Sequence, residues 1–409
     1  MTVDRRQFLR LTSAGSVTIP NVVWAGQDSS RVGKSRIRTV EPILIRGARN
    51  YHAWTLVRIR TDDGLVGIGE GFSFGWDNIE RPRKIHSYMK QLGERLVNKN
   101  PLQIQAFVES ARSTDQVTDK LWWAAVAGIE IALWDIAGKT TGQPIYAMLG
   151  GTLRKTIPLY ANHGVFFNND TEWPFDIRRI AGVKEAGFPL FKWDPFTSPP
   201  GNPGSDVIHR DVRQVAQVRQ LVGDEYPLGI DAHSRYDLDA ALVAARALEP
   251  HRVEFFEEPV HMDNAKWYPR IAEVATMPLA AGESYATRKQ AYPLLTSGTI
   301  GAFQPEIGAN GGILETVKIA SLCDTLGLRV LPHNWCSPIT ALATAHAVAG
   351  INNLWNMEYA GSSPAPDCQW EHELIDPPLM IRNGQLSLPT GPGLGFQLNE
   401  ALVRTRRIS

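Results

Sequence analysis

The sequence from residue 253 to residue 259 is Val-Glu-Phe-Phe-Glu-Glu-Pro, a short apolar run that ends in two carboxylates and a proline. A similar run precedes it and ends at Asp231, and another follows it and ends at Glu283. Asp231, Glu257 and Glu283 are each 26 residues apart, which is about the length of one strand–helix unit. We therefore expect three carboxylates at the same height on three neighbouring parallel strands.

Short apolar runs alternate with amphipathic helices from about residue 155 onward. The runs are Ile157–Ala161, Leu190–Trp193, Pro227–Ile230, Val253–Phe256, Pro278–Ala281, Ala302–Gln304, Arg329–Leu331 and Leu354–Met357. Between them, the spacing predicts helices such as Leu238–Leu248, with Asp237 as N-cap, and Ile313–Leu326. Alternating strands and helices predict an α/β fold with a parallel sheet, and eight units close most simply into a (β/α)8 barrel of the TIM type. The alternative is a doubly wound open sheet, but no Gly-rich phosphate loop follows the first run.

The segment before these units has a different pattern. Residues 36–72 alternate like strands, with a turn at Asp62-Asp63-Gly64, and residues 79–150 have the apolar spacing of helices. We expect an α+β capping domain over residues 36–150 and the barrel over residues 155–370. Residues 371–409 have little periodicity, and we expect this C-terminal segment to pack on the capping domain and complete it.

The N-terminus resembles a twin-arginine export signal. Arg5 and Arg6 precede a weakly apolar stretch that ends at Val23-Trp24-Ala25, a sequence typical of a cleavage site. We interpret residues 1–25 as a signal peptide that is removed on export to the periplasm. The alternative is a frayed basic tail on a cytoplasmic enzyme. We find no other stretch long and apolar enough for a membrane span.

The composition excludes several classes of protein. Lys+Arg and Asp+Glu are both 42, so no excess charge favours nucleic acid or an anionic membrane as a partner. Hydrophobic residues make up 43% of the chain, as in an ordinary globular protein. Three scattered cysteines are too few for a disulfide framework or a zinc site.

Polar side chains follow nearly every predicted barrel strand at the point where it ends. Besides the three carboxylates, these residues are Lys192 and Asp194 after the second run, His233 after the third, Glu306 after the sixth, His333 after the seventh and Glu358 after the eighth. Each alone is more simply a solvated loop residue or a helix cap, but barrel enzymes build their active sites at this end. Three converging carboxylates would repel one another without a cation, and magnesium prefers such oxygen ligands. The pattern predicts a magnesium site there.

Several motifs resemble the mandelate racemase branch of the enolase superfamily. They are Phe256-Glu257-Glu258-Pro259, Ala281-Gly282-Glu283, Gln304-Pro305-Glu306 with Gly311-Gly312-Ile313, and the helical stretch 129–139 with Gly150-Gly151. The resemblance implies abstraction of the proton α to a carboxylate, giving an enediolate stabilised by one Mg²⁺ per subunit. By position, it implies that Asp231, Glu257 and Glu283 are the metal ligands, with Glu258 as a supporting neighbour or as the ligand in place of Glu257.

The same resemblance implies roles for the other strand-end residues. His333 corresponds to the base, and Glu306 stands where the family usually has an Asp bonded to that base. Glu358 corresponds to a residue that contacts the substrate carboxylate. Where the branch often has Lys-x-Lys, this chain has Lys192-Trp193-Asp194, so Lys192 is placed to neutralise the substrate carboxylate. Asp194 replaces the second base, which argues against two-base racemisation.

The Asp-x-His pattern at Asp231 and His233 resembles the acid sugar dehydratases, of the galactonate dehydratase kind, in which this His protonates the departing 3-hydroxyl. We therefore expect a hydro-lyase that converts a sugar acid, an aldonate or aldarate, to a 2-keto-3-deoxy acid. His233 as an inert neighbour of the metal is the alternative. A cycloisomerase or epimerase on the same scaffold, or a non-catalytic exported binding protein for sugar acids, are alternative functions. The family resemblance also favours a homo-oligomer.

Loops of the capping domain are expected to supply specificity. Tyr51, His52 and Trp76 are candidates for contacts with substrate hydroxyls, beside Asp194 and Glu358. Ordinary surface positions are the alternative for each of them.

Overall fold

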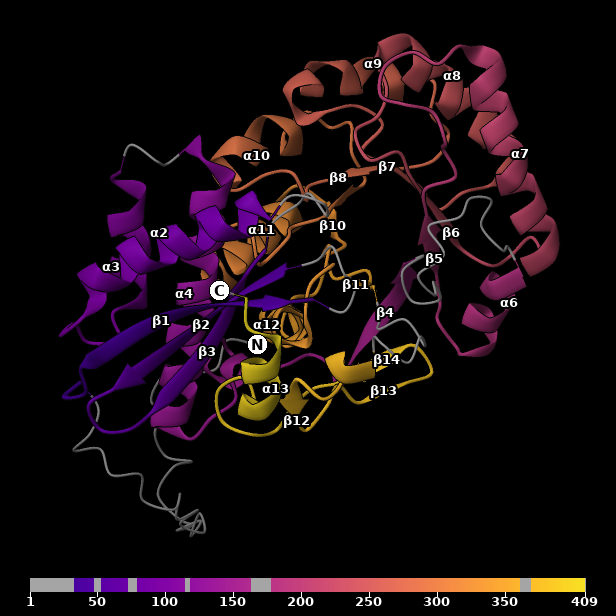
Figure 1. Cartoon of the computed structure of the whole chain (residues 1–409). Coiled ribbons are helices and arrows are strands. Elements are labelled where there is room, and N and C mark those ends of the chain that lie inside the picture. Colours follow the sequence, from indigo (N-terminus) through magenta and orange to yellow (C-terminus); the bar gives the residue numbers. More distant parts are fainter. Residues whose placement is uncertain are drawn as a thin grey trace, which may run out of the picture.

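The computed structural model describes residues 33–47, 53–72, 79–114, 118–162, 178–360 and 369–408 of the 409-residue chain. A small α+β unit, drawn in indigo and purple in Figure 1, packs against a larger barrel that runs from magenta to orange. The expected (β/α)8 barrel with an N-terminal capping unit is confirmed. Two predictions fall outside the described residues. They are the signal peptide over residues 1–25 and the substrate contacts of Tyr51, His52 and Trp76.

The N-terminal unit is an antiparallel three-stranded sheet covered by helices. Its strands are β1 (Ile37–Arg46), β2 (Ala53–Thr61) and β3 (Val66–Gly71), and its helices are α2 (Glu80–Leu96), α3 (Ile104–Arg112), α4 (Lys120–Thr141) and α5 (Ile145–Met148). The predicted turn at residues 62–64 joins β2 to β3, with Gly64 at a φ of 89°. Both the strands over 36–72 and the helices over 79–150 are therefore confirmed.

Helix α4 lies unusually close to strand β3 because glycines line the strand face that meets it. Every second residue of β3 is glycine, and period-two alternation places Gly67, Gly69 and Gly71 on one face. A Cβ on Gly69 would lie 1.9 Å from the carbonyl oxygen of Gly128 in α4, so any larger residue would force the helix away. This close contact makes α4 the central helix of the N-terminal unit.

Helix α4 also corrects one expectation from the sequence. It has 22 residues, and an 18-residue window of it has a mean hydropathy of 1.3, so it is long and apolar enough to cross a bilayer, although no such stretch was predicted after the signal. In the structure, 89% of that apolar window is buried inside the protein. Burial on nearly all sides explains why the helix is apolar all round, as expected of a core helix.

The barrel contains the eight predicted strands in sequence order around its wall. They are β4 (Thr156–Asn162), β5 (Phe191–Trp193), β6 (Leu228–Asp231), β7 (Phe255–Glu257), β8 (Leu279–Ala281), β9 (Ala302–Phe303), β10 (Arg329–Val330) and β11 (Met357–Tyr359). Parallel pairing of β11 with β4, and a bridge from Val330 to Leu354, close the wall, so the open doubly wound sheet is excluded.

Helices on the outside of the wall connect the strands, as Figure 1 shows. They are α6 (Arg178–Glu185), α7 (Ser205–Val222), α8 (Leu238–Leu248), α9 (Tyr268–Ala272), α10 (Arg288–Leu295), α11 (Ile313–Thr325) and α12 (Pro338–Val348), with short 3-10 turns η3 (Glu249–His251) and η4 (Met262–Trp267); a further 3-10 turn, η5 (Gln369–Glu371), follows the last barrel strand. The bounds of α8 and its N-cap at Asp237 are those predicted, and α11 ends one residue earlier than expected.

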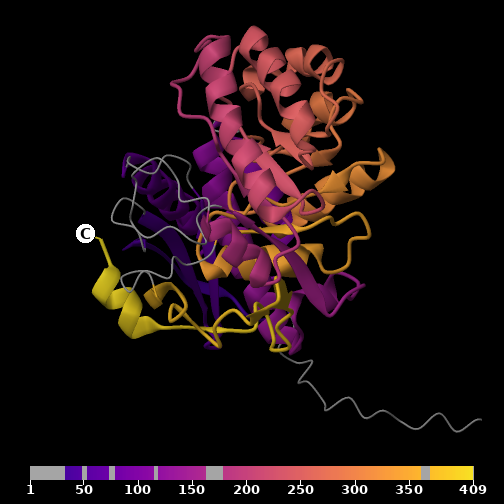
Figure 2. The ribbon, with the colours of Figure 1, turned by 90° about the vertical axis from the view of Figure 1, so that its right-hand side faces the viewer.

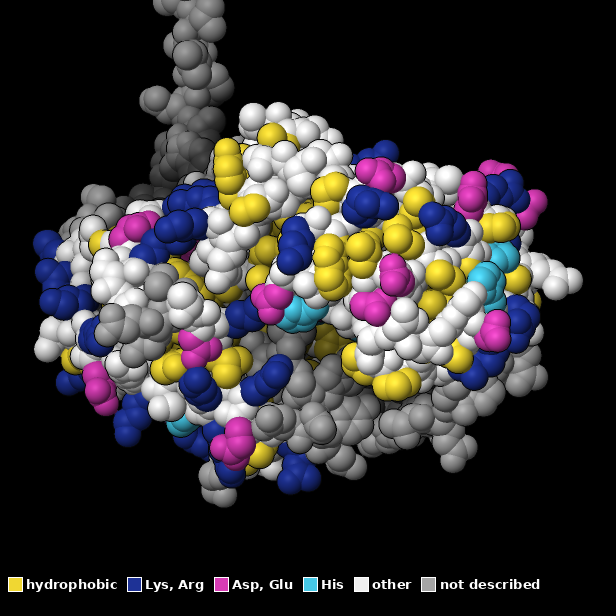
Figure 3. Space-filling view, turned by 90° about the horizontal axis from the view of Figure 1, so that it is seen from above, with side chains coloured by type: hydrophobic (Ala, Val, Ile, Leu, Met, Phe, Trp, Pro, Cys, Tyr) yellow, Lys and Arg dark blue, Asp and Glu magenta, His cyan; other side chains and the backbone are white. Residues whose placement is uncertain are grey.

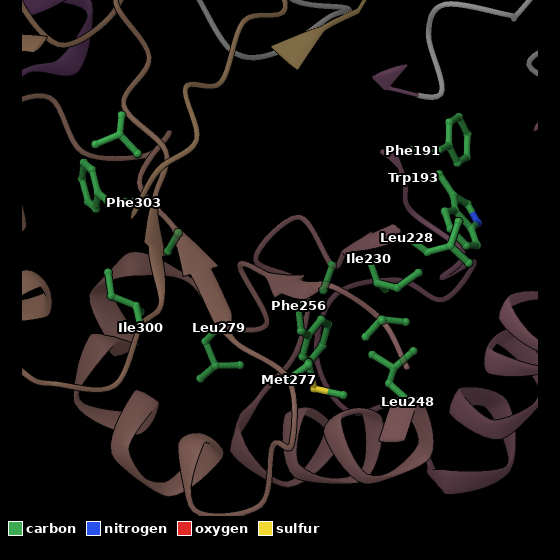
Figure 4. Close-up of a cluster of buried hydrophobic side chains, with 14 of the residues drawn as sticks. Phe191, Trp193, Leu228, Ile230, Leu248, Phe256, Met277, Leu279, Ile300 and Phe303 are labelled. Atoms are coloured by element: carbon green, nitrogen blue, oxygen red, sulfur yellow. The ribbon is translucent and has the colours of Figure 1, made fainter. Parts of the chain in front are cut away.

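Alternation along the strands separates two kinds of barrel residue. Phe256, Ile230 and Leu279 belong to the layer between strands and helices, part of which Figure 4 shows, with Phe256 and Leu279 directed toward the helices. Phe255 belongs to a separate small cluster inside the barrel, where the lack of a side chain at Gly229 leaves room for its ring. The next inward position after Phe255 is Glu257, so the strand period itself places apolar residues below and a carboxylate above.

The C-terminal segment joins both units rather than the capping unit alone. It contains β12 (Ile375–Asp376), β13 (Ile381–Arg382), β14 (Gln385–Ser387), β15 (Gln397–Leu398) and α13 (Glu400–Arg406). Strand β14 pairs antiparallel with β4 of the barrel, while α13 packs beside β1, as the yellow segment in Figures 1 and 2 shows. The predicted contact with the capping domain is present, and the pairing with the barrel was not foreseen.

A buried carboxylate ties the capping unit to the barrel. Glu130 of α4 is fully buried and accepts hydrogen bonds from the backbone N–H groups of Ile313 and Leu314, at 2.8 and 2.9 Å. These groups open α11, where backbone donors lack partners within the helix. Gly312 is required beside them, because a Cβ there would lie 2.1 Å from a Glu130 oxygen.

We expect His346 to make the stability of the fold depend on pH. This α12 residue is 1% exposed; its Nδ1 accepts the N–H of Tyr146 and its Nε2 lies 3.3 Å from the carbonyl of Leu394. Burial lowers its pKa from 6.5 to about 4, so the unfolded chain binds a proton that the folded chain excludes between these values. The free energy of unfolding should therefore fall by up to about 3 kcal/mol as the pH drops from 6.5 to 4.

The H346Q variant should be less stable at pH 7.5 and should lose that part of the pH dependence in urea unfolding. The matched control H209Q changes an exposed histidine of α7 and should follow the wild type. Equal pH dependence in H346Q and the wild type would contradict the assignment.

Candidate active site

Inward-pointing side chains at the carboxyl ends of the strands form a polar layer above the apolar interior. The first four strands contribute Asn162, Lys192, Asp231 and Glu257, all nearly or fully buried. Asp231 pairs directly with Glu257 in the register of β6 and β7. Glu283 follows β8 by two residues. The predicted convergence of these carboxylates on neighbouring strands is therefore what the barrel produces.

Lys192 is the cation at the centre of this layer. Its Nζ lies 3.0 Å from Asp231 Oδ2 and 2.7 Å from Glu257 Oε1, and 3.5 Å from Glu358 Oε1. The second oxygen of Glu257 accepts a hydrogen bond from Gln304 Nε2 at 2.5 Å. Lys192, which we expected to face the substrate carboxylate, is instead 1% exposed and neutralises the protein's own carboxylates.

Glu358 of β11 is fully buried and already engaged. It accepts hydrogen bonds from the hydroxyl of Tyr160, the amide of Asn162 and the backbone N–H of Asn334. With four polar neighbours, Lys192 included, this carboxylate organises the layer. The predicted contact with the substrate carboxylate requires an accessible side chain. In this conformation the side chain of Glu358 is not accessible.

His333 and Glu306 form a hydrogen-bonded pair after β10 and β9. Nδ1 of His333 lies 2.7 Å from Glu306 Oε2, and the backbone N–H of Gly308 holds the other Glu306 oxygen at 2.8 Å. Nε2 of His333 lies 3.1 Å from Glu283 Oε2, so the second ring nitrogen is directed toward the carboxylate layer. The longer Glu in place of Asp therefore reaches the imidazole directly.

A second imidazole–carboxylate pair lies after β6 and β5. His233 Nδ1 is 2.8 Å from Asp194 Oδ2, and its Nε2 is 3.4 Å from Asp231 Oδ2. Arg235 Nη2 contacts the same Asp194 oxygen at 2.5 Å, and the N–H of Phe196 binds the other at 2.7 Å. Because both oxygens of Asp194 are bound by the protein, its position fits orientation of His233 and not the substrate contact that we expected.

The backbone around this second pair is strained. His233, Ser234 and Glu258 have φ values of 46°, 58° and 35°, in the left-handed region that non-glycine residues rarely adopt. Such conformations persist only where surrounding contacts hold them, and they concentrate at functional sites. The hydroxyl of Ser234 donates to Glu258 Oε2 at 2.6 Å and fixes the two strand-end loops together.

Proton affinities in the layer depend on burial and on neighbouring charge. Burial and the charge of Asp231 raise the pKa of Glu257, and burial raises that of Glu283 to about 7 against the opposing charge of His333. Burial opposes protonation of both imidazoles, but adjacent carboxylates outweigh it and raise the pKa values of His233 and His333 to about 10. The layer therefore holds more negative charge than Lys192 alone neutralises.

The donor set fits a hard divalent cation, although the side chains are not arranged around one. Among the described residues, no group of three His, Cys, Asp or Glu side chains is placed to hold a metal ion. The contacts explain why: Lys192 bonds Asp231 and Glu257, and Glu283 is turned to His333. Three carboxylates at the ends of consecutive strands match the oxygen ligands that Mg²⁺ takes.

A cavity of about 450 Å³ opens over this layer between the capping unit and the barrel. The barrel supplies His233, Glu258, Glu283, Ser284 and Tyr285 to its lining, and α2 and α4 of the capping unit supply Arg81 and Lys120. Figure 3 shows this face, on which acidic, basic and histidine side chains surround a hollow.

The structure adds residues that the sequence analysis overlooked. Asn162 ends the first strand, and Gln304 lies in a motif quoted only for Glu306. Glu70 at the end of β3 is 1% exposed and accepts hydrogen bonds from Ser337, the N-cap of α12. Burial raises the pKa of Glu70 to about 7. The sequence analysis considered only charged residues and histidines at the ends of the barrel strands. Including amide side chains and the end of β3 would have found all three residues.

Comparisons with known proteins cover both units of the fold. Residues 34–150 match the N-terminal domain of the mandelate racemase/muconate lactonizing enzyme family, and residues 176–402 match the enolase C-terminal domain-like family. The chain is 33% identical over 363 residues to the D-galactonate dehydratase of Xanthomonas euvesicatoria pv. vesicatoria, covering 87% of this chain and 92% of that protein.

Two further relatives differ in their described activities. The D-gluconate dehydratase of Thermoproteus tenax is 28% identical over 378 residues, which is 91% of this chain and 74% of that protein. The solved 3,6-anhydro-D-galactonate cycloisomerase of Zobellia galactanivorans has a TM-score of 0.79 and 25% identity, with 91% of this chain and all of that one covered. Family members bind Mg²⁺ in general, which agrees with the donor set.

We expect Lys192 to be the residue on which the stability of the layer depends most. Replacing it in K192M leaves Asp231, Glu257 and Glu358 buried without their shared cation, and removing one partner of a buried pair costs about 3–5 kcal/mol. Urea unfolding without divalent ions measures this loss. The control K84M breaks a pair with Asp119 in which Lys84 is 51% exposed, and should cost no more than about 1 kcal/mol. Similar losses in both variants would contradict the central role of Lys192.

Proposed function

Because this chain belongs to the mandelate racemase/muconate lactonizing enzyme family of the enolase superfamily, we propose that it is a magnesium-dependent hydro-lyase acting on a sugar acid. Relatives at 28% and 33% identity are named D-gluconate and D-galactonate dehydratases. The substrate class is an aldonate or aldarate, and the product is a 2-keto-3-deoxy acid.

One observation carries the proposal: two imidazoles lie on opposite sides of the barrel mouth, and a carboxylate holds Nδ1 of each. His233 follows the third strand and His333 follows the seventh, which are four strands apart in a wall of eight. Asp194 and Glu306 are the partners, both within 2.8 Å of the ring nitrogen. Both Nε2 atoms are thereby directed at the carboxylate layer between them. Elimination of water needs such a division, with one base and one acid.

The reaction follows from these positions. His333 Nε2 removes the proton from C2 of the sugar acid, and the electrons move into the carboxylate to give an enediolate. His233 donates its proton to the 3-hydroxyl, the C3–O bond breaks, and water leaves. The resulting enol takes up a proton at C3 and loses the proton of its C2 hydroxyl, which gives the 2-keto acid, so that one substrate gives one keto acid and one water.

Asp231, Glu257 and Glu283 would hold the magnesium ion, which supplies positive charge beside the substrate carboxylate as negative charge develops there. Glu283 occupies a double position, since its Oε2 also contacts His333 Nε2. A magnesium ion held by Glu283 would weaken the attraction of that carboxylate for the His333 proton, which is the largest of the causes that raise the pKa of the imidazole, and would favour His333 as a base. Lys192 compensates the remaining charge of the layer.

Cycloisomerisation is the second candidate, because a solved neighbour is described as a 3,6-anhydro-D-galactonate cycloisomerase. It would use the same abstraction at C2 without loss of water. The mass of the product separates the two, since an isomerase leaves the mass unchanged. A binding protein without activity has no need of the oriented base His333.

We expect the two histidines to have separable effects. The H333N variant should lose both keto-acid formation and exchange of the C2 proton with deuterated water, because it lacks the base. The H233N variant should retain C2 exchange and lose about 10²–10⁴-fold in keto-acid formation, because only the acid is missing. Proton NMR and a semicarbazide assay on a panel of C5 and C6 sugar acids provide the two measurements.

The H209N variant, on the exposed face of α7, should behave as the wild type in both assays. Retained elimination in H233N would remove the acid assignment. A wild-type enzyme that neither exchanges nor eliminates on any sugar acid would contradict the function itself.

We also expect Mg²⁺ to stabilise the folded protein through the three carboxylates. At one hundred times its Kd the ion should raise the free energy of unfolding by about 2.7 kcal/mol, measured as a higher Tm. D231N should lose most of this shift because it removes a ligand. E249Q, which changes an exposed residue of η3, should retain it. A shift of equal size in D231N would place the ion elsewhere.

Export and assembly complete the proposal. The Arg5-Arg6 pair and the sequence at residues 23–25 support twin-arginine export to the periplasm, with cytoplasmic location as the alternative. Fractionation of cells that express either the unaltered chain or a variant with Lys at both Arg5 and Arg6 tests the export. The unaltered chain should be found in the periplasm, and the variant should stay in the cytoplasm. Family membership supports a homo-oligomer, which size-exclusion chromatography tests.

A further inference from the structure

The base His333 and its partner Glu306 lie beside a strand of the capping unit that has no role in the proposed reaction. Strand β3 ends at Gly71, and the residues around this end, Glu70 and Phe72, contact the two barrel loops that carry Glu306 and His333. The ring of Phe72 also lies 6.0 Å from the imidazole of His333, measured between the ring centroids. Both units of the fold therefore form the surroundings of the base.

The first contact leads through Gly308 to the partner of the base. The backbone N–H of Phe72 donates a hydrogen bond to the carbonyl of Gly308 at 2.8 Å. The N–H of Gly308 donates in turn to Glu306 Oε1 at 2.8 Å, and Glu306 Oε2 lies 2.7 Å from His333 Nδ1. A continuous series of hydrogen bonds thus runs from the end of β3 to the imidazole.

This series requires a close approach that only glycine permits at position 308. A Cβ on Gly308 would lie 2.9 Å from the Cβ of Phe72 and 3.2 Å from Glu306 Oε1. The turn itself is closed by the N–H groups of Ala309 and Asn310, which both bond the carbonyl of Glu306 at 3.0 Å. Because the closed turn packs directly against the end of β3, a displacement of β3 would be passed on to Glu306.

The second contact fixes the chain just after the base. Glu70 is 1% exposed, and its carboxyl group accepts hydrogen bonds from the hydroxyl and the backbone N–H of Ser337, four residues after His333. The same hydroxyl accepts the N–H of Ile339 and so caps α12. Glu70 therefore holds the start of the helix at which the segment carrying His333 ends.

These contacts matter because a base acts only over a short range. It must lie about 3 Å from the atom that loses the proton, and a displacement of about 1 Å can cost about 10²-fold in rate. The barrel fixes the backbone next to His333, where the N–H of Asn334 donates to Glu358 at 3.2 Å. The direction of the ring depends instead on the side chains around it, and the contact at Nδ1 leads through Glu306 to β3.

We propose that the end of β3, from Glu70 to Phe72, is a positioning element for the base, so that the capping unit sets the direction of the His333 imidazole as well as covering the cavity. Glu70 acts through Ser337, and the N–H of Phe72 acts through Gly308. This inference rests on the proposed function, in which His333 removes the C2 proton, and adds to it residues outside the barrel.

Kinetics of the Mg²⁺-loaded enzyme on the sugar acid with the highest turnover test the contact of Glu70. E70A should lose about 10- to 100-fold in kcat and in the rate of C2 proton exchange, while KM changes less than about threefold, because proton abstraction is impaired and binding is kept. E70Q should stay within about threefold of the wild type. Burial raises the pKa of Glu70 to about 7, so an amide resembles the neutral form and can still bond Ser337 with both atoms.

The G308A variant tests the other contact without a change at Glu70. Its methyl group has to displace Phe72 or the carboxylate of Glu306, and it should lower kcat and C2 exchange about as much as E70A. The matched control is G182A in α6, where a Cβ would meet nothing within 4 Å. It should keep the wild-type kcat.

A second control separates positioning of the base from support of the fold. Glu130 is also a buried carboxylate that ties the capping unit to the barrel, through the first turn of α11. E130A should lower Tm as E70A does, but at temperatures where it is folded it should keep the wild-type kcat. Loss of activity in E70A alone therefore reports on the base.

Proton NMR provides a readout that does not require turnover. The proton on His333 Nδ1 lies in a short hydrogen bond to Glu306 and should give a downfield signal that is absent from H333N. This signal should shift or broaden in E70A and G308A and stay unchanged in E130A and G182A.

Two results would overturn the positioning role and leave the dehydratase function standing. One is an unchanged kcat or an unchanged NMR signal in E70A and G308A, and the other is a loss of kcat in E130A equal to that in E70A. Absence of turnover on every sugar acid would instead contradict the function, and the NMR signal would still decide whether β3 positions the imidazole.

Discussion

The structure depends on the compensation of several buried carboxylates at one end of the barrel. Asp231, Glu257 and Glu358 surround the ammonium of Lys192 within 3.5 Å, and Glu283 and Glu306 flank His333. Concentrated negative charge is unfavourable in a buried site unless cations and hydrogen-bond donors lie beside it. The neighbouring donors, among them Asn162, Gln304 and Tyr160, belong to strands β4 and β9 or to their ends. The barrel wall is thus the frame that places each donor opposite its carboxylate.

The capping unit is part of this compensation as well as a cover. Helix α4 presses against the glycine face of β3 and carries Glu130 to the first turn of α11. The end of β3 delivers Glu70 to Ser337, just after His333, and the start of α4 delivers Lys120 to the cavity. These contacts come from one closely packed sheet–helix pair, which lines the cavity opposite the strand ends. The cavity is therefore lined by residues of both units.

Much of this could be predicted, and the failures have a common cause. The eight barrel strands and the bounds of α8 followed from apolar runs and spacing, because strand period and helix period are local properties. The pairing of His333 with Glu306 was also within reach, since both end adjacent strands. The partners of Asp194 and Lys192 also end adjacent strands, but the sequence does not show whether a strand-end side chain turns to its neighbour or to a substrate. Helix α4 shows the same dependence on tertiary contacts. Its apolar sequence is compatible with a membrane span or with a protein core, and only its packing neighbours distinguish the two.

The sequence by itself determined the family, the barrel and most of the polar residues that end the barrel strands. Each of these is encoded in short motifs at the strand ends, where the type of residue and its spacing suffice. Only the tertiary structure decided what each side chain does there. It assigned Asp194 to His233, placed Lys192 among the protein's own carboxylates, and bonded the carboxylate of Glu258 to the hydroxyl of Ser234. These assignments depend on which atoms approach within hydrogen-bond distance, and that is set by the closure of the barrel and the packing of the capping unit, not by any local stretch of chain.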